Sequence, residues 1–154
     1  DPNVRLDPQP DIDLWRRRVE AFASHAHLIK ASEEDLALLY PGRDPGEVAR
    51  GWLNPRCRLV FVTHGGAGAS VHCTHGSWSR PADTALPLRD TVGAGDGFAV
   101  GVLSGLLEGL PLCEAVRRGN AVGAIQVMSV GDNDGLPTRA QLAAFMEKGE
   151  PANA

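Results

Sequence analysis

A loop of small residues, closed by an aspartate, is the segment of this sequence best suited to chemistry. Residues 90–96 are Asp-Thr-Val-Gly-Ala-Gly-Asp, directly before a predicted helix. Gly93, Ala94 and Gly95 let backbone N–H groups approach an anion closely, and the helix adds the positive end of its dipole. A carboxylate there, that of Asp96, can accept a hydroxyl proton while the N–H groups stabilise charge on a transferring phosphoryl group.

The residues of this segment bear on three other interpretations. It is not a Walker phosphate loop, since no Gly-Lys-Ser/Thr follows it. The glycines by themselves are equally compatible with close packing of a helix on a strand, but the closing aspartate favours anion binding. An NAD-binding domain is not indicated, because no Gly-x-Gly-x-x-Gly follows an opening strand with an acidic residue roughly 20 positions later.

Helices and strands alternate along the chain and would carry this loop to the edge of a sheet. Apolar residues spaced by three or four predict a helix at 11–27, and capping residues, prolines and a continuous apolar run predict further helices at 33–40, 45–53, 95–109, 111–127 and 139–147. Runs of β-branched and aromatic residues predict strands at 28–31, 58–63 and 69–74, with a hairpin at 75–77. The helix from 95 is apolar enough to be buried nearly all round. The order predicts an α/β fold with a mainly parallel sheet.

Composition excludes several classes of partner. The 154 residues, 43% of them hydrophobic, are enough for one domain with one core. A net charge of -4, with 15 basic residues that are scattered, predicts binding neither to nucleic acid nor to an anionic membrane. The longest apolar run falls short of the roughly 18 residues of a membrane span. No signal peptide opens the chain, and small molecules are the expected partners.

Cysteines and histidines predict neither a disulfide framework nor a zinc site. The cysteines are odd in number and lack Cys-x-x-Cys spacing, which fits a reducing cytoplasm; they are Cys57, Cys73 and Cys113. Two histidine pairs could in principle bind a metal, His25-x-His27 and His72-x-x-His75. No cysteine or carboxylate completes either pair at ligand spacing, so ordinary surface or core histidines are the better interpretation.

Residues 90–96, with Gly-Phe-Ala-Val-Gly at 97–101, resemble the C-terminal signature of ribokinase-like (PfkB-type) carbohydrate kinases. Other landmarks occur in the family's order across essentially the whole chain. The resemblance implies a ribokinase-like, Rossmann-like sheet flanked by helices. Residues 1–148 would be the C-terminal nucleotide-binding portion and 149–154 a flexible tail. The fold would be incomplete at its N-terminal side, without the first strands, the small β lid and most sugar contacts of a full-length member.

The resemblance also assigns roles to polar residues before the loop. Asp-Pro-Asn-x-Arg at 1–5 is similar to a strand end in the family, from which Asn3 and Arg5 would reach the phosphates and the substrate. Arg5 could hold a carboxylate in a bidentate manner. Ser32-x-x-Asp35 is similar to the segment Asn-x-x-Glu, which helps place metal and phosphate, although Ser and Asp replace Asn and Glu. Helix capping accounts for Ser32 about as well.

Three further segments carry implied contacts. Thr63-x-Gly65-x-x-Gly68 resembles a turn that lies along the nucleotide. Asn120 matches an asparagine near the adenine, with a helix-surface amide as the alternative. Asp132, in Gly-Asp-x-x-Gly-Leu-Pro-Thr, resembles a substrate contact of 2-keto-3-deoxygluconate kinases, although an aspartate in a turn is usually a turn former.

The implied activity is ATP-dependent phosphorylation of a sugar or sugar acid at a primary hydroxyl, with Asp96 as base and residues 93–95 as anion hole. ATP and Mg²⁺ are the implied cofactors, and K⁺ beside the loop at Asp90 stays open. The first candidate is a 2-keto-3-deoxygluconate kinase, with a fructokinase or ribokinase-type enzyme as alternative. A truncated, non-catalytic nucleotide-binding module is the second hypothesis. Exposed strand edges would favour association with another copy.

Overall fold

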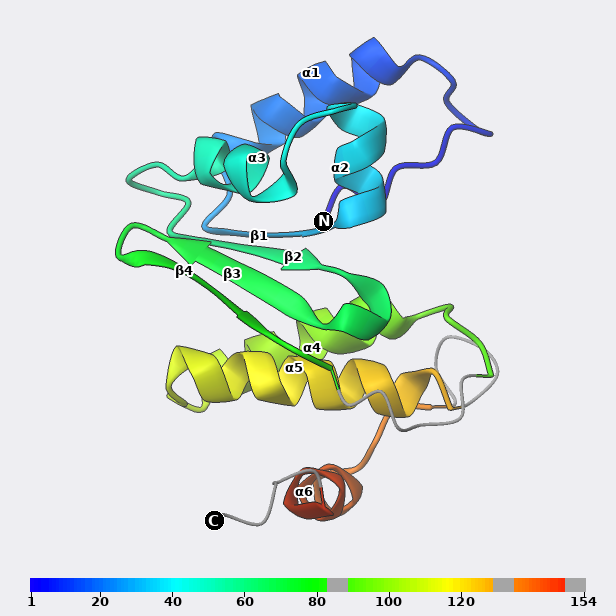
Figure 1. Ribbon diagram of the computed structural model, residues 1–154, viewed down its shortest axis with the longest axis vertical. Helices are drawn as coiled ribbons and strands as arrows, with labels where there is room; N and C mark the ends of the chain where they lie inside the picture. The colour runs from blue at the N-terminus through cyan, green and yellow to red at the C-terminus, as the bar shows by residue number, and fades with distance from the viewer. Residues whose placement is uncertain (83–88, 129–134, 149–154) are drawn as a thin grey trace. The chain divides into compact units, whose positions relative to one another are not determined.

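The computed structural model describes residues 1–82, 89–128 and 135–148 (Figure 1). They form two compact units instead of the single core that the composition predicted. The first unit comprises residues 1–65 and 69–79, and the second comprises 66–68 and the described residues from 80 onward. The tail predicted at 149–154 lies outside the described residues.

A four-stranded sheet in the order β1-β2-β3-β4 organises the first unit. Its strands are β1 (Leu28–Ser32), β2 (Leu59–Thr63), β3 (Ala69–Cys73) and β4 (Gly76–Arg80). β1 and β2 are parallel, with Ser32 opposite Thr63, whereas β2 and β3 are antiparallel, with Thr63 opposite Ala69. The α/β class is confirmed, but this sheet is mixed and not mainly parallel. A connection as short as residues 64–68 can join only antiparallel neighbours.

Helices α1 (Ile12–Ala23), α2 (Glu33–Leu39) and α3 (Pro45–Trp52) lie together on one face of this sheet (Figure 1). Each begins where a side-chain oxygen accepts a first-turn N–H, and the capping residues are Asp11, Ser32 and Asp44. These oxygens satisfy donors that a helix cannot pair by itself. The buried core of the unit includes Ile29, Leu36, Val48, Trp52, Val60 and Val62.

Two antiparallel helices, α4 (Ala94–Leu107) and α5 (Leu112–Gln126), form most of the second unit. Their backbones approach closely at small residues, since a methyl group on Gly101 would lie 2.7 Å from the Gly119 Cα. The third helix of the unit, α6 (Arg139–Lys148), is tied to α5 where Arg117 Nη2 donates to the carbonyl oxygen of Met146 at 2.6 Å. Glycine therefore sets the distance between α4 and α5.

The prediction that the first of these helices is buried nearly all round is wrong. Val100, Leu103 and Leu107 on α4 are 53%, 46% and 88% exposed, whereas Phe98 and Val102 are buried. The sequence of α4 is hydrophobic at almost every position, so it did not distinguish the exposed face from the buried one. Much of the buried face consists of glycines. Among the described residues, no helix is both long and apolar enough to cross a membrane.

We expect Gly101→Ala and Gly51→Ala to have opposite effects on stability. Both glycines lie inside helices, so alanine improves helix propensity at each by up to about 1 kcal/mol. A methyl group on Gly51 would meet no atom within 4 Å, whereas one on Gly101 would meet three backbone atoms within 2.9 Å. Gly51→Ala should therefore raise the free energy of unfolding, and Gly101→Ala should lower it by about 1–3 kcal/mol. Urea unfolding followed by circular dichroism measures both, and equal shifts would contradict the close approach of α4 and α5.

Candidate functional site

The loop before α4 is held at both ends by its own backbone. The N–H groups of Arg89 and Asp90 donate to the carbonyl oxygen of Val127, at the end of α5, over 2.8 and 3.2 Å. Asp90 Oδ1 accepts the N–H of Val92 at 3.0 Å, which closes a tight turn. Gly93 follows with φ 79° and ψ -9°, a left-handed conformation that disfavours residues with a Cβ atom. The chain thus enters α4 in one defined direction.

The first turn of α4 presents backbone donors and one carboxylate. Gly93 is the N-cap, and the N–H of Gly97 is the one that bonds back to its carbonyl oxygen, at 2.8 Å. The N–H of Ala94 already donates to Thr91 at 3.2 Å. The N–H groups of Gly95 and Asp96 precede the first intrahelical bond, and the side chain of Asp96 is exposed. This arrangement suits an anion at the helix N-terminus.

Ser32 and Asp35 form a capping box at the carboxyl end of β1. Ser32 Oγ accepts the N–H of Asp35 at 3.0 Å, and Asp35 Oδ2 accepts the N–H of Ser32 at 3.4 Å. The helix-capping alternative for Ser32 is therefore present in the structure. Because β1 and β2 are in parallel register, Ser32 lies opposite Thr63, another predicted site residue.

Asp35 also fixes the segment that carries Asn3 and Arg5. Its Oδ1 accepts the N–H of Val4 at 2.7 Å, and both Val4 and Asp35 are buried. Asn3 has a φ of 46°, which is uncommon for a residue with a side chain. Asn3 and Arg5 are exposed on either side of Val4, so they lie beside the end of β1 with Ser32.

The contacts of Asp35 bear on its predicted role toward a metal. Both of its oxygens accept backbone N–H groups, and the residue is 6% exposed. Across the part of the chain that is described, no group of three or more His, Cys, Asp or Glu side chains could hold a metal ion. These residues do not form a metal cage by themselves. A Mg²⁺ ion would fit here only with most of its ligands supplied by phosphates and water, as is common for this ion.

Gly68 and Asn120 both contact the same backbone segment of the second unit. Gly68 has a φ of 98°, and a Cβ atom there would lie 2.2 Å from the carbonyl oxygen of Arg80. Asn120 Nδ2 donates to the carbonyl oxygens of Arg80 and Pro81, at 3.1 Å each. The amide is therefore an anchor for residues 80–82, a role that nothing in the sequence indicated.

Predicted site residues occur in both units. The first unit holds Asn3, Arg5, Ser32, Asp35, Thr63 and Gly65, and the second holds Gly68, Gly93, Ala94, Gly95, Asp96 and Asn120. Asp132 lies outside the described residues. Sequence reasoning missed a chain of hydrogen bonds through His64 and His72. The spacing Ser70-x-His72, which puts both side chains on one face of a strand, was the available signal.

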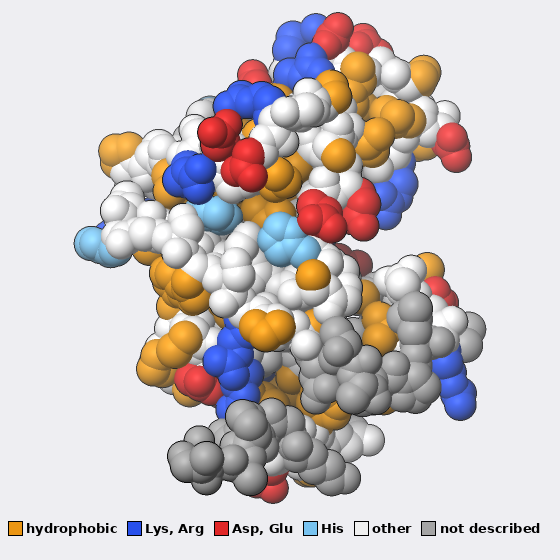
Figure 2. Space-filling view, in the orientation of Figure 1, with side chains coloured by type: hydrophobic (Ala, Val, Ile, Leu, Met, Phe, Trp, Pro, Cys, Tyr) orange, Lys and Arg blue, Asp and Glu red, His pale blue; other side chains and the backbone are white. Residues whose placement is uncertain are grey.

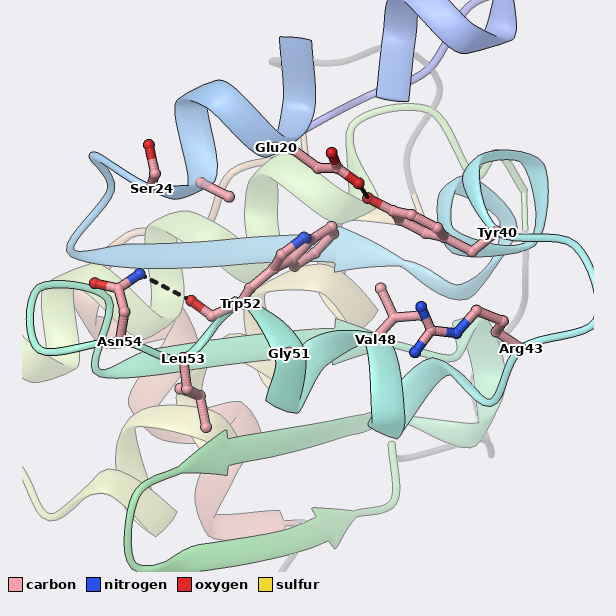
Figure 3. Close-up of a pocket in the computed structure, with 10 residues that line it drawn as sticks. Glu20, Ser24, Tyr40, Arg43, Val48, Gly51, Trp52, Leu53 and Asn54 are labelled. Atoms are coloured by element: carbon pink, nitrogen blue, oxygen red, sulfur yellow. Dashed lines mark hydrogen bonds between the residues drawn. The ribbon is translucent and has the colours of Figure 1, made fainter. Parts of the chain in front are cut away.

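A cavity of about 320 Å³ lies among the helices of the first unit (Figure 3). Glu20 and Tyr40 stand at one end, where the Tyr40 hydroxyl donates to Glu20 Oε1 at 3.1 Å, and Trp52, Leu53 and Asn54 lie toward the other. Burial, with the hydrogen bond to Glu20 adding to it, raises the pKa of Tyr40. The lining includes none of the predicted site residues, so this cavity is separate from the candidate site.

Known proteins similar to this chain include several sugar kinases. The 2-dehydro-3-deoxygluconokinase of Bacillus subtilis is 39% identical over 146 residues, which is 95% of this chain and 45% of that protein. A fructokinase of Vibrio cholerae, solved with fructose, ADP and calcium, matches with a TM-score of 0.83 and 29% identity over 95% of this chain and 49% of its own. An Escherichia coli protein assigned as Ribokinase II, solved with ATP and Mg²⁺, matches with a TM-score of 0.85 and 25% identity over 96% of this chain and 47% of its own.

The extent of these matches defines what the chain corresponds to. It spans about half the length of the relatives it resembles. Residues 1–139 match the profile of pfkB family carbohydrate kinases, so the match includes the loop at 90–96 and the ends of β1 and β2. On that ground the chain belongs to the pfkB family of carbohydrate kinases.

Proposed function

We propose that this chain provides the nucleotide-binding portion of an enzyme that transfers the γ-phosphoryl group of Mg-ATP to a primary hydroxyl of a sugar or sugar acid. The observation that carries the proposal is the loop 90–96, which ends in a carboxylate in the first turn of α4, where the N–H groups of Gly95 and Asp96 precede the first intrahelical bond. Asp96 takes the hydroxyl proton. The N–H groups of Gly95 and Asp96, with Gly93 shaping the turn, hold the phosphoryl oxygens, so that positioning and electrostatics supply the catalysis.

The remaining site residues receive complementary roles in this proposal. Asn3 and Arg5 reach toward the phosphates and the acceptor, and Ser32 and Thr63 stand at the ends of adjacent parallel strands, where ligands bind in α/β sheets. Gly65 and Gly68 let the backbone of the turn at 63–68 approach the nucleotide closely. Asn120 supports this part of the site by holding residues 80–82. The cation would enter with ATP, and Asp35, which accepts the backbone N–H groups of Val4 and Ser32, would be the residue of this chain nearest to its role.

The first candidate acceptor is 2-keto-3-deoxygluconate, also called 2-dehydro-3-deoxygluconate. Its support is the 39% identity with an enzyme named for that substrate, together with an exposed arginine, Arg5, that can bind a carboxylate. Fructose and ribose are the alternatives. A substrate contact from Asp132 belongs to the same proposal, as do a cytoplasmic location and association with a second copy through the edge strand β1.

A non-catalytic nucleotide-binding module is the second candidate, and one observation favours it. The chain covers 45% of the 2-dehydro-3-deoxygluconokinase of Bacillus subtilis, so a polypeptide limited to these residues would lack much of that enzyme. Such a module would bind ATP or ADP through the same residues and turn nothing over.

ATP-dependent ADP release with 2-keto-3-deoxygluconate, fructose and ribose, run beside calorimetric titration with Mg-ADP, tests the two candidates. The kinase proposal expects nucleotide binding and turnover, fastest with the sugar acid. Binding without turnover on any of the three sugars would favour the module. A chain that neither binds nucleotide nor releases ADP would contradict both.

A further inference from the structure

A continuous chain of hydrogen bonds crosses the first unit from α2 to β4. Glu33 Oε2 lies 2.7 Å from His64 Nδ1, and His64 Nε2 lies 2.9 Å from Ser70 Oγ. Ser70 Oγ lies 3.2 Å from His72 Nε2, and His72 Nδ1 lies 2.8 Å from Ser77 Oγ. Five side chains, from α2, the turn after β2, β3 and β4, are therefore joined in series. Figure 2 shows histidine side chains at the surface beside acidic ones on this part of the molecule.

The positions of the protons in this series of hydrogen bonds follow from which groups can donate and which can only accept. His72 is 4% exposed, and burial lowers its pKa below 6.5, with Arg50 lowering it further and Asp44 opposing. The His72 imidazole is therefore neutral at pH 7.5, with one donor and one acceptor nitrogen. The carboxylate of Glu33 can only accept, so the facing nitrogen, His64 Nδ1, must be the one that carries a proton.

With His64 neutral as well, one arrangement satisfies every contact. His64 Nδ1–H donates to Glu33, and its bare Nε2 accepts the hydroxyl proton of Ser70. Ser70 Oγ then accepts Nε2–H of His72, whose bare Nδ1 accepts the hydroxyl proton of Ser77.

His64 connects this series to the candidate site. It stands between Thr63 and Gly65 in the turn that leaves β2, while Glu33 directly follows Ser32 at the end of β1. Both ring nitrogens are engaged, and the side chain is 25% exposed. The ring is thus held from α2 on one side and from β3 on the other, and with it the backbone between Thr63 and Gly65.

Among the described residues, charged groups face both ends of the series. His64 faces Glu33 from α2 and Ser70 and His72 from β3. His72 faces Ser77 from β4. It also faces the charges of Asp44, the N-cap of α3, and of Arg50 in α3, and Gly46 of the same helix lies against its ring. Ser70 itself is 8% exposed, so it serves as a link between the histidines and not as a nucleophile open to substrate.

We propose that His64 is a positioning residue for the nucleotide: its ring, held by Glu33 through Nδ1–H and by Ser70 through Nε2, fixes the turn at Thr63 and Gly65 in the conformation that receives ATP or ADP. The proposal rests on the proposed function of the site.

The first test is a measurement of ring tautomers that needs no activity. Long-range ¹H–¹⁵N spectra of the chain at pH 7.5 should show His64 protonated at Nδ1 and His72 at Nε2. Glu33→Ala should shift His64 toward the Nε2–H form, and Glu33→Gln, which keeps an acceptor oxygen, should restore Nδ1–H. Glu34→Ala is the matched control, an exposed acid in the same helical turn, and should change neither ring. An Nε2–H tautomer of His64 in the unchanged chain would overturn the assigned direction.

The second test is calorimetric titration with Mg-ADP at pH 7.5. His64→Leu and Glu33→Ala should each weaken binding by about tenfold, the size expected for loss of one well-placed hydrogen bond, and Glu33→Gln should recover most of it. His75→Leu, which changes an exposed histidine of the hairpin, should bind as the unchanged chain does. Circular dichroism checks that each variant is folded.

The outcomes separate this inference from the proposed function. Equal affinity of the unchanged chain and of folded His64→Leu would refute the positioning role while leaving the nucleotide site intact. Absence of Mg-ADP binding by the unchanged chain would contradict the proposed function and the positioning role together, and the tautomer spectra would still decide the direction of the hydrogen bonds.

Discussion

Replacing Asp96 by asparagine will lower the rate of phosphoryl transfer by about two to four powers of ten, the range expected for loss of a catalytic base. The amide has nearly the same shape as the carboxylate but cannot take the proton of an attacking hydroxyl. Asp96 is exposed on the first turn of α4, and the N–H groups that would hold phosphoryl oxygens belong to the backbone. Affinity for Mg-ADP should therefore be retained.

The comparison needs the polypeptide in which turnover is found, with kcat and KM taken from ADP release and nucleotide affinity from calorimetry. Asp13→Asn is the matched control, because Asp13 is also an exposed aspartate in the first turn of a helix, α1. It should leave kcat unchanged. If Asp96→Asn turned over at the rate of the control, Asp96 would not be the base.

Gly68→Ala will lower the free energy of unfolding by about 3 kcal/mol, through steric conflict and backbone strain acting together. The new methyl group would lie 2.2 Å from the carbonyl oxygen of Arg80 and 2.5 Å from the nitrogen of Ala82, and a φ of 98° is already unfavourable for alanine. Residues 80–82 must then move, which also separates Arg80 and Pro81 from the Asn120 amide. We expect weaker nucleotide binding as a consequence.

Gly42→Ala measures the cost of backbone strain without a steric conflict. Gly42 has a φ of 78°, and a methyl group there would meet no atom within 4 Å. Alanine at position 42 should cost about 1 kcal/mol, from the left-handed backbone alone. Urea unfolding of the two variants measures the difference. Equal losses of stability would mean that residues 80–82 do not pack on Gly68 as described.

Local structure was predictable because its causes are local. Asp11, Ser32 and Asp44 each precede a helix in the sequence, and each caps it through its side chain in the structure. β-branched residues mark β2, and the glycines at 65, 66 and 68 mark the turn after it. Spacing and turn chemistry depend on neighbours within a few positions, so the sequence alone contains them.

Burial and sheet direction were less predictable. The uniformly apolar segment at 97–107 gives no periodic signal. Its packing against α5 decides that Val100, Leu103 and Leu107 are on the exposed face of α4. The direction of β3 relative to β2 depended on a connection of five residues, 64–68, which permits only a reversal.

The sequence by itself determined the loop of small residues at 90–96, the aspartate that ends it and the family to which the chain belongs, because these depend on residue types at fixed spacing. Only the tertiary structure decided what Asp35, Asn120 and His64 contact. Their partners, Val4, the carbonyls of Arg80 and Pro81, and Glu33 and Ser70, lie between 6 and 40 positions away. Hydrogen bonds over such separations follow from how strands and helices pack, which no local pattern of residues records.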